Sequence, residues 1–167
     1  MSKREELLVL TANLPRVEEC TCLAVRQAAR HITQFYDQHL APVGLRTTQF
    51  SILAKLKQLG PMTINALADE LVMDRTTLGR NILPLERAGL ISVAPGRTDR
   101  RSRELQLTGA GVERLRAARL GWSEAQTRFA AAFGDERAVG LRALLREVSA
   151  TDLPATCAAE AEPDNPR

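Results

Sequence analysis

Four short segments follow one another between residues 63 and 107, and their order narrows the choice of fold. The stretch TINALADEL, residues 63–71, places apolar residues on one side of a short helix. The three residues VMD then lead into DRTTLGRNILPLERAGLI, which begins with Asp74, a residue type favoured at helix N-caps. The sequence therefore predicts a helix, a tight turn and a second helix.

Two strand segments follow the second helix directly. LISVA and RELQL, residues 90–94 and 103–107, flank the turn PGRTDRRS, and RELQL alternates polar and apolar residues. We therefore expect two short strands joined by an arginine-rich turn. Pro84 lies within the preceding helix and removes a backbone donor, which leaves open whether that helix kinks or ends there.

Longer helical patterns lie on both sides of this central segment. Only 4% of the residues are aromatic, whereas alanine, leucine and arginine are prominent, which favours helices over a sheet-rich fold. Asn13 is available to cap the first helix, Thr47 or Thr48 the second, and Thr108 the one after the strands. The expected flanking helices cover residues 14–40, residues 47–60, a stretch after Thr108 and residues 135–150. We expect a mainly α (α+β) protein.

An apolar stripe runs along the helix after Thr108 with spacings of three and four residues. Its members are Leu115, Ala118, Trp122, Ala125, Phe129 and Ala132. Such a stripe is a packing seam, either within one chain or between two subunits. The subunit interface is favoured, because the small central domain is too short to cover so many apolar faces.

The chain's charge and termini limit its class. The whole chain of 167 residues carries a net charge of +3, and residues 72–107 alone hold seven arginines against four acids. The N-terminus lacks the pattern of a signal peptide and no apolar run is long enough to span a bilayer, so we expect a cytoplasmic protein. Three cysteines, an odd number, favour reduced thiols over structural disulfides.

A helix-turn-helix followed by a basic hairpin is suited to duplex DNA. The second helix of such a pair enters the major groove, where helix amides and hydroxyls bind phosphates and arginine binds guanine. On a helical wheel the polar face lies opposite Leu78, Ile82 and Leu85. We expect Asp99 to brace one wing arginine by a salt bridge. The candidate DNA-binding residues are Arg75, Thr76, Thr77 and Arg80 on the helix, and Arg97, Asp99, Arg100, Arg101 and Arg103 in or beside the turn.

These motifs resemble those of the MarR-type winged-helix transcriptional regulators. The stretch TDRRSRELQLTGAG matches the family's wing, with Asp99 and Arg101 at the wing positions, and the resemblance extends over about residues 20–148. It implies a homodimer that binds a pseudo-palindromic operator and commonly represses genes until an inducer binds. It also implies a helical dimerisation region (14–46 and 108–150) around a winged helix-turn-helix domain (47–107). Outside the resemblance we expect a flexible N-terminus (1–13) and, from its acidic and proline-containing composition, a disordered tail (151–167).

The first two helices also resemble those of the organic-hydroperoxide-sensing branch of that family. Cys22 takes the place of the oxidised cysteine, and Tyr36 matches a tyrosine that contacts the thiol from the other subunit. Two further tyrosines of that branch are replaced here by Arg26 and Thr47. The alternative is that Cys20 and Cys22 are only small buried residues; if both are helical, they point about 200° apart and cannot pair.

Control by a small aromatic or acidic ligand is a second hypothesis. The crevice expected between the dimer helices and the winged domain includes residues able to bind an anion or a ring, namely Arg26, Arg30, His31, Tyr36 and His39. The two histidines are eight residues apart and the cysteines show no ligand spacing, so no metal site and no cofactor are expected.

Two other classes of function compete with a DNA-binding regulator. A thiol-dependent peroxide-reactive enzyme would use Cys22 as nucleophile, but the sequence places no histidine and carboxylate beside it. A helical interaction module without DNA binding does not account for the arginine-rich turn. We therefore expect a regulator and not an enzyme.

Overall fold

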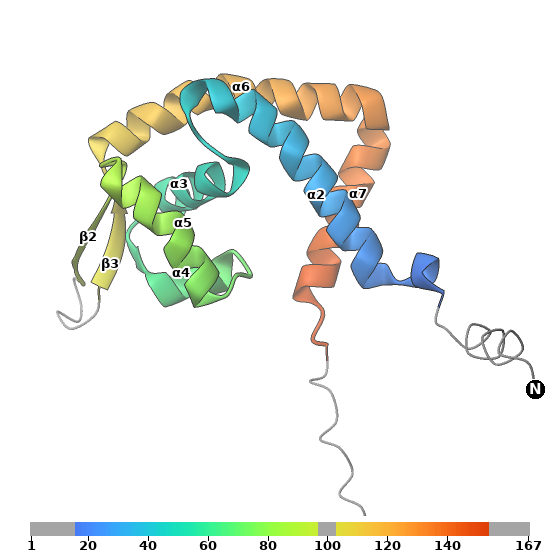
Figure 1. Cartoon of the computed structure of the whole chain (residues 1–167), viewed down its shortest axis with the longest axis horizontal. Coiled ribbons are helices and arrows are strands. Elements are labelled where there is room, and N and C mark those ends of the chain that lie inside the picture. The colour runs from blue at the N-terminus through green and yellow to red at the C-terminus, as the bar shows by residue number, and fades with distance from the viewer. Residues whose placement is uncertain (1–15, 97–102, 154–167) are drawn as a thin grey trace, which may run out of the picture. The chain divides into compact units, whose positions relative to one another are not determined.

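The computed structural model describes residues 16–96 and 103–153, and its fold is mainly helical with one small sheet (Figure 1). Its elements are η1 (Val17–Glu19), α2 (Thr21–Leu40), η2 (Ala41–Val43), α3 (Thr47–Leu59), β1 (Met62–Thr63), α4 (Ile64–Glu70), α5 (Arg75–Arg87), β2 (Ile91–Pro95), β3 (Arg103–Leu107), α6 (Gly109–Phe133) and α7 (Asp135–Ala150). The expected mainly α (α+β) class is confirmed. The segments expected to be flexible or disordered, 1–13 and most of 151–167, lie outside the described residues.

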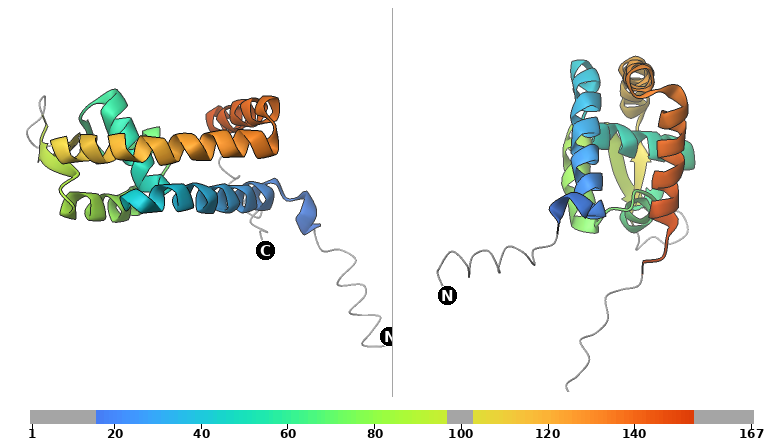
Figure 2. Two further views of the ribbon diagram at one scale, coloured as in Figure 1. Left: turned by 90° about the horizontal axis from the view of Figure 1, so that it is seen from above. Right: turned by 90° about the vertical axis from the view of Figure 1, so that its right-hand side faces the viewer.

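The first long helix begins later than the sequence indicates. Residues 17–19 form a separate 3-10 turn, and Cys20 then adopts an extended backbone as the N-cap of α2. Its Sγ accepts a hydrogen bond from the Leu23 amide at 3.4 Å. The predicted start near residue 14 is therefore wrong. Because Cys20 lies outside the helix, the angle of about 200° expected between Cys20 and Cys22 does not apply. From Thr21 onward α2 is one continuous helix (Figure 2).

A carboxylate from α2 holds the start of α3. The backbone amide and the hydroxyl of Thr47 both donate to Oδ1 of Asp37 at 2.6 Å. Thr47 is thus the first residue of α3 rather than its cap, and Arg46 takes the N-cap position. Sequence inspection missed this bond because its two residues lie on different helices. It ties the end of one long helix to the beginning of the next.

The helix pair forms as predicted, and its caps explain why. The Thr63 hydroxyl accepts from the Ala66 amide at the start of α4, and the Asp74 carboxylate accepts from the Thr77 amide at the start of α5. Pro84 does not end α5, which continues to Arg87. Gly89 then adopts φ +66°, a left-handed conformation that lets the chain leave the helix.

The turn between α4 and α5 contains a strained residue. Val72 has φ +49° and is 78% exposed, although a β-branched residue strongly disfavours the left-handed region. We expect Val72→Gly to raise the free energy of unfolding by about 1 kcal/mol, because glycine adopts this conformation without a Cβ clash. Urea unfolding measures the change. A lower urea midpoint for Val72→Gly would show that the side chain stabilises the turn, and Val72→Ala, which keeps the Cβ, is the matched control.

The strands form a three-stranded antiparallel sheet in the order β1-β3-β2. The two long strands pair from Ile91 opposite Leu107 to Pro95 opposite Arg103, and they lie side by side in Figure 1. This hairpin was predicted. The third strand, β1, was not, because its two residues pair with β3 across more than forty positions of sequence. The hairpin of β2 and β3 is therefore paired, through β3, with the strand that precedes α4.

Two compact units make up the chain, Met1–Thr127 and Arg128–Arg167. The core of the first is aliphatic, and its fully buried large side chains are Leu40, Ile52, Leu53, Leu67, Leu78, Leu85 and Ile91. In the second unit the rings of Phe129 and Phe133 stack, and the Arg137 guanidinium lies 4.3 Å from the Phe133 ring centroid. Among the described residues, no helix combines the length and apolarity required to cross a bilayer.

Candidate nucleic-acid interface

One face of α5 is buried and the opposite face is polar and exposed. Leu78, Ile82 and Leu85 are at most 5% exposed and anchor the helix in the core. The exposed residues of the helix include Arg75, Thr76, Thr77, Arg80 and Arg87. Within the described part of the chain, none of these three arginines forms an ion pair. The face therefore presents hydroxyl and guanidinium donors to solvent, as its sequence predicts.

Asp74 organises the first turn of this helix. The hydroxyl and the amide of Thr77 donate to its carboxylate, which holds the pKa of Asp74 below its ordinary value of 3.8; the Thr76 amide and the charge of Arg80 act in the same direction. The Thr77 amide lies 2.8 Å from Oδ1 of Asp74. The carboxylate thus uses two backbone donors of the α5 N-terminus.

This lowered pKa predicts a pH dependence of stability. Because the folded pKa of Asp74 is below the unfolded value, the charged carboxylate stabilises the fold above about pH 4, and this contribution is lost as the pH falls through the folded pKa. We expect the urea midpoints of wild type and Asp74→Asn to converge between about pH 6 and about pH 3. A midpoint difference that stays constant over that range would contradict this assignment.

Only part of the predicted wing can be placed. Arg103 is exposed at the start of β3, opposite Pro95. Arg97, Asp99, Arg100 and Arg101 lie outside the described residues, so their contacts and the expected salt bridge of Asp99 remain predictions. After β3, the Thr108 hydroxyl donates to the Gly89 carbonyl at 2.7 Å and accepts from the Gly111 amide. Thr108 therefore caps α6, as predicted, and ties the end of the wing to the end of α5.

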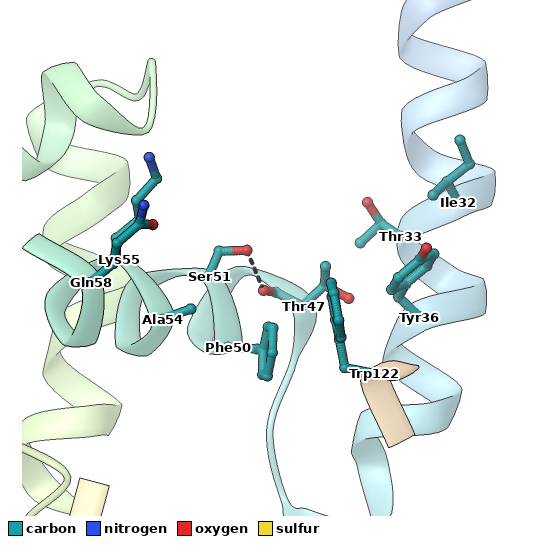
Figure 3. Close-up of a pocket in the computed structure, with 10 residues that line it drawn as sticks. All are labelled: Ile32, Thr33, Tyr36, Thr47, Phe50, Ser51, Ala54, Lys55, Gln58 and Trp122. Atoms are coloured by element: carbon teal, nitrogen blue, oxygen red, sulfur yellow. Dashed lines mark hydrogen bonds between the residues drawn. The ribbon is translucent and has the colours of Figure 1, made fainter. Parts of the chain in front are cut away.

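A pocket of about 290 Å³ lies between α2, α3 and α6 in the first unit. Figure 3 shows Tyr36 and Ile32 on α2, Thr47 and Phe50 on α3, and Trp122 on α6 facing the same space. The rings of Phe50 and Trp122 stack with their centroids 5.9 Å apart. Lys55 lies at the end of the pocket away from Tyr36 and forms an ion pair with Glu70 of α4.

This pocket differs from the crevice expected from the sequence. Of the five residues expected to line it, only Tyr36 does so. Arg26, Arg30 and His31 are exposed and lie outside the pocket, and the His39 ring bonds to the Phe35 carbonyl. The sequence missed Phe50 and Trp122 because 72 residues separate them. Their apolar character was visible, but their proximity was not.

Comparison with known proteins identifies the family. The MarR family model matches residues 45–102, which include α3, the helix-turn-helix and β2. The transcriptional regulator MosR of M. tuberculosis is 34% identical, with a TM-score of 0.69 over 80% of this chain and 98% of its own. The chain belongs to the MarR family. A second structure of MosR is a complex with DNA, matched at 34% identity with a TM-score of 0.65 over 80% of this chain and 100% of that one.

Two further relatives are regulators by name. The transcriptional repressor CouR, bound to a 23-mer DNA duplex, is 25% identical, with a TM-score of 0.72 over 80% of this chain and 94% of its own. The HTH-type regulator YwoH of Bacillus subtilis is 33% identical over 84 residues. These residues make up 50% of this chain and 61% of that relative's length. Because members of the MarR family are transcriptional regulators, the predictions of a winged helix and of a regulator rather than an enzyme are confirmed.

The cysteines of this MarR-family chain lie near the start of α2. Cys20 and Cys22 are both exposed, so the alternative that they are small buried residues is wrong for the single chain. Cys22 and Tyr36 are 14 residues apart on α2, about 21 Å along its axis, so they do not meet within one chain. In the described ranges 16–96 and 103–153, no cluster of three or more histidine, cysteine or acidic residues is arranged to hold a metal ion.

Proposed function

We propose that this MarR-family chain is a homodimeric repressor that binds a pseudo-palindromic operator through α5 and the wing. The exposed arginines and threonines of α5 carry the proposal, since they lie opposite the buried face of the helix. The Thr76 hydroxyl suits phosphates, the Thr77 hydroxyl oxygen can accept from a base edge, and Arg80 suits guanine. Arg103 continues the positive charge onto the wing. The DNA complexes of MosR and CouR support this use of the fold.

The proposed dimer uses the helical segments outside the winged domain. Along α7, Val139, Leu144 and Val148 are 55–61% exposed, and residues 24–31 of α2 are all exposed. A single chain leaves these apolar and helical faces without cover, and a second copy would bury them. Sedimentation equilibrium is expected to give twice the chain mass of 18.3 kDa. A monomer at micromolar concentration would contradict the proposed dimer.

The DNA-binding proposal is tested with reduced wild-type protein and a labelled duplex from upstream of its own gene. We expect tight binding whose logarithm falls steeply and linearly with the logarithm of salt concentration, because several phosphates are neutralised. A flat titration at low salt would refute DNA binding and support an interaction module instead. An unrelated duplex of equal length measures the non-specific background.

Control of the repressor is proposed to act through Cys22 or through the pocket. Cys22 is exposed near the N-terminus of α2 and is therefore accessible to a hydroperoxide. If oxidation releases the operator and Cys22→Ser abolishes that release, the thiol is the switch. Consumption of more than one equivalent of peroxide per thiol would instead indicate an enzyme.

Binding of a ligand in the pocket can be followed by tryptophan fluorescence. Trp122 is the only tryptophan of the chain and lines the pocket beside Phe50. A small aromatic acid bound there is expected to change the fluorescence of Trp122 and to lower operator affinity in parallel, with benzoate as the first probe. Phe50→Ala should weaken both effects. If benzoate changes neither signal, this ligand class is excluded at the pocket.

A further inference from the structure

Two residues on and beside the exposed face of α5 have no polar side chain. Leu83 is 48% exposed and lies about 140° around the helix from buried Leu78. Gly79 lies one turn before it, in the interior of a helix that glycine destabilises relative to alanine. Leu83 falls on the face that carries Thr76 and Arg80, and the half-buried Gly79 lies at the edge of that face, about 60° from Thr76 and about 60° from buried Ile82. Neither residue contributes a side-chain hydrogen-bond donor to this face.

Packing within the chain does not require the glycine. A Cβ added at Gly79 would meet no atom within 4 Å, whereas one added at Gly111 would lie 2.1 Å from the Leu90 carbonyl oxygen. Gly79 has a negative φ and needs no left-handed conformation, since it is not among the glycines with positive φ. The space that a side chain at residue 79 would occupy is therefore open, and we refer to it as a shallow recess.

Leu83 borders this recess. On the helical wheel it lies about 40° from Gly79 and about 20° from Thr76, and its Cα is about 6 Å further along the axis than that of Gly79. Together Gly79 and Leu83 form a small apolar surface, which we call the apolar recess. Hydroxyl and guanidinium groups lie beside it on the same face.

Only one group in the major groove matches such a surface. The base edges present hydrogen-bond donors and acceptors, and the single apolar group is the C5-methyl of thymine. We propose that the apolar recess of Gly79 and Leu83 receives the C5-methyl group of one thymine in each operator half-site. This proposal rests on the proposed function, because it requires α5 to lie in the major groove. It adds a specificity determinant to the phosphate and guanine contacts of Thr76, Thr77 and Arg80.

The test uses duplexes in which single thymines are replaced by deoxyuridine. This replacement removes the methyl group and keeps every hydrogen-bonding group of the base pair. The operator is first delimited by footprinting, and each thymine is then replaced in turn. For wild-type protein we expect one position per half-site at which affinity falls about fourfold, the effect of one buried methyl group.

Two variants assign that position to the recess. In Leu83→Ala, deoxyuridine at the sensitive position should cause no further loss of affinity, because the contact is already absent. Gly79→Ala should raise the melting temperature and bind the deoxyuridine duplex at least as tightly as the thymine duplex, because its new methyl group occupies the recess. Leu59→Ala is the matched control, since Leu59 is 47% exposed but lies on α3, and it should keep the wild-type sensitivity.

Each failure has a distinct meaning. If wild-type protein binds the operator and no thymine position is sensitive, the recess reads no methyl group and the repressor proposal stands. If a sensitive position exists but persists in both variants, another residue makes the contact and the inference is overturned. If wild-type protein binds no DNA, the proposed function fails and the inference fails with it.

Discussion

Arg80→Ala is expected to weaken operator binding by about 1–3 kcal/mol, a loss of about 5-fold to about 160-fold, while the melting temperature stays within the error of wild type. Arg80 is exposed, lies opposite the buried side of α5 and forms no ion pair within the described residues. Removing this side chain should therefore lower the affinity for the operator without lowering the stability of the fold. Equilibrium titration with the operator duplex and thermal unfolding measure the two quantities on one sample.

Two further variants separate charge from base recognition. Arg80→Lys keeps the charge but loses the planar guanidinium that binds guanine at two points, so it should retain salt dependence and lose sequence preference. Arg116→Ala removes one positive charge from α6, where Arg116 pairs with Glu113, and should leave binding unchanged.

In the wing, Arg101→Ala is expected to weaken binding as well. If both Arg80→Ala and Arg101→Ala bind like wild type, the site assignment is wrong.

Gly111→Ala is expected to lower the free energy of unfolding by about 3 kcal/mol, the upper part of the range for overpacking. An added Cβ would lie 2.1 Å from the Leu90 carbonyl oxygen and 2.7 Å from a methyl carbon of Leu107. The Leu90 carbonyl belongs to the backbone and accepts a hydrogen bond from the Thr108 amide, so it cannot rotate aside. The start of α6 would have to move away from the sheet.

Gly109→Ala provides a control two residues earlier in the same helix. A Cβ at Gly109 would meet nothing within 4 Å, so this variant should be as stable as wild type or slightly more stable. Urea unfolding of the two variants under identical conditions isolates the effect of the contact. Equal stability of Gly111→Ala and Gly109→Ala would show that α6 does not approach β2 and β3 as closely as described. Operator affinity of Gly111→Ala should fall as well, because the helix carries the end of the wing.

Local signals in the sequence were sufficient for most of the helices and the hairpin. Thr63 and Asp74 are N-caps whose side-chain oxygens bind an amide three residues ahead, and Gly89 ends α5 through a left-handed turn. The last helix covers the predicted residues 135–150. These features depend on neighbours within one or two turns, and so the order of residues predicts them. The exposed polar face of α5 follows from the same periodicity.

The sequence by itself determined the helix-turn-helix and the hairpin, because caps and periodicity act within a few residues, and the resemblance of its motifs indicated the MarR family. Only the tertiary structure decided how distant residues meet. It placed Phe50 against Trp122, Asp37 against Thr47, and β1 beside β3. Each of these contacts depends on how helices and strands pack, and packing is set by the summed burial of many side chains rather than by any local motif.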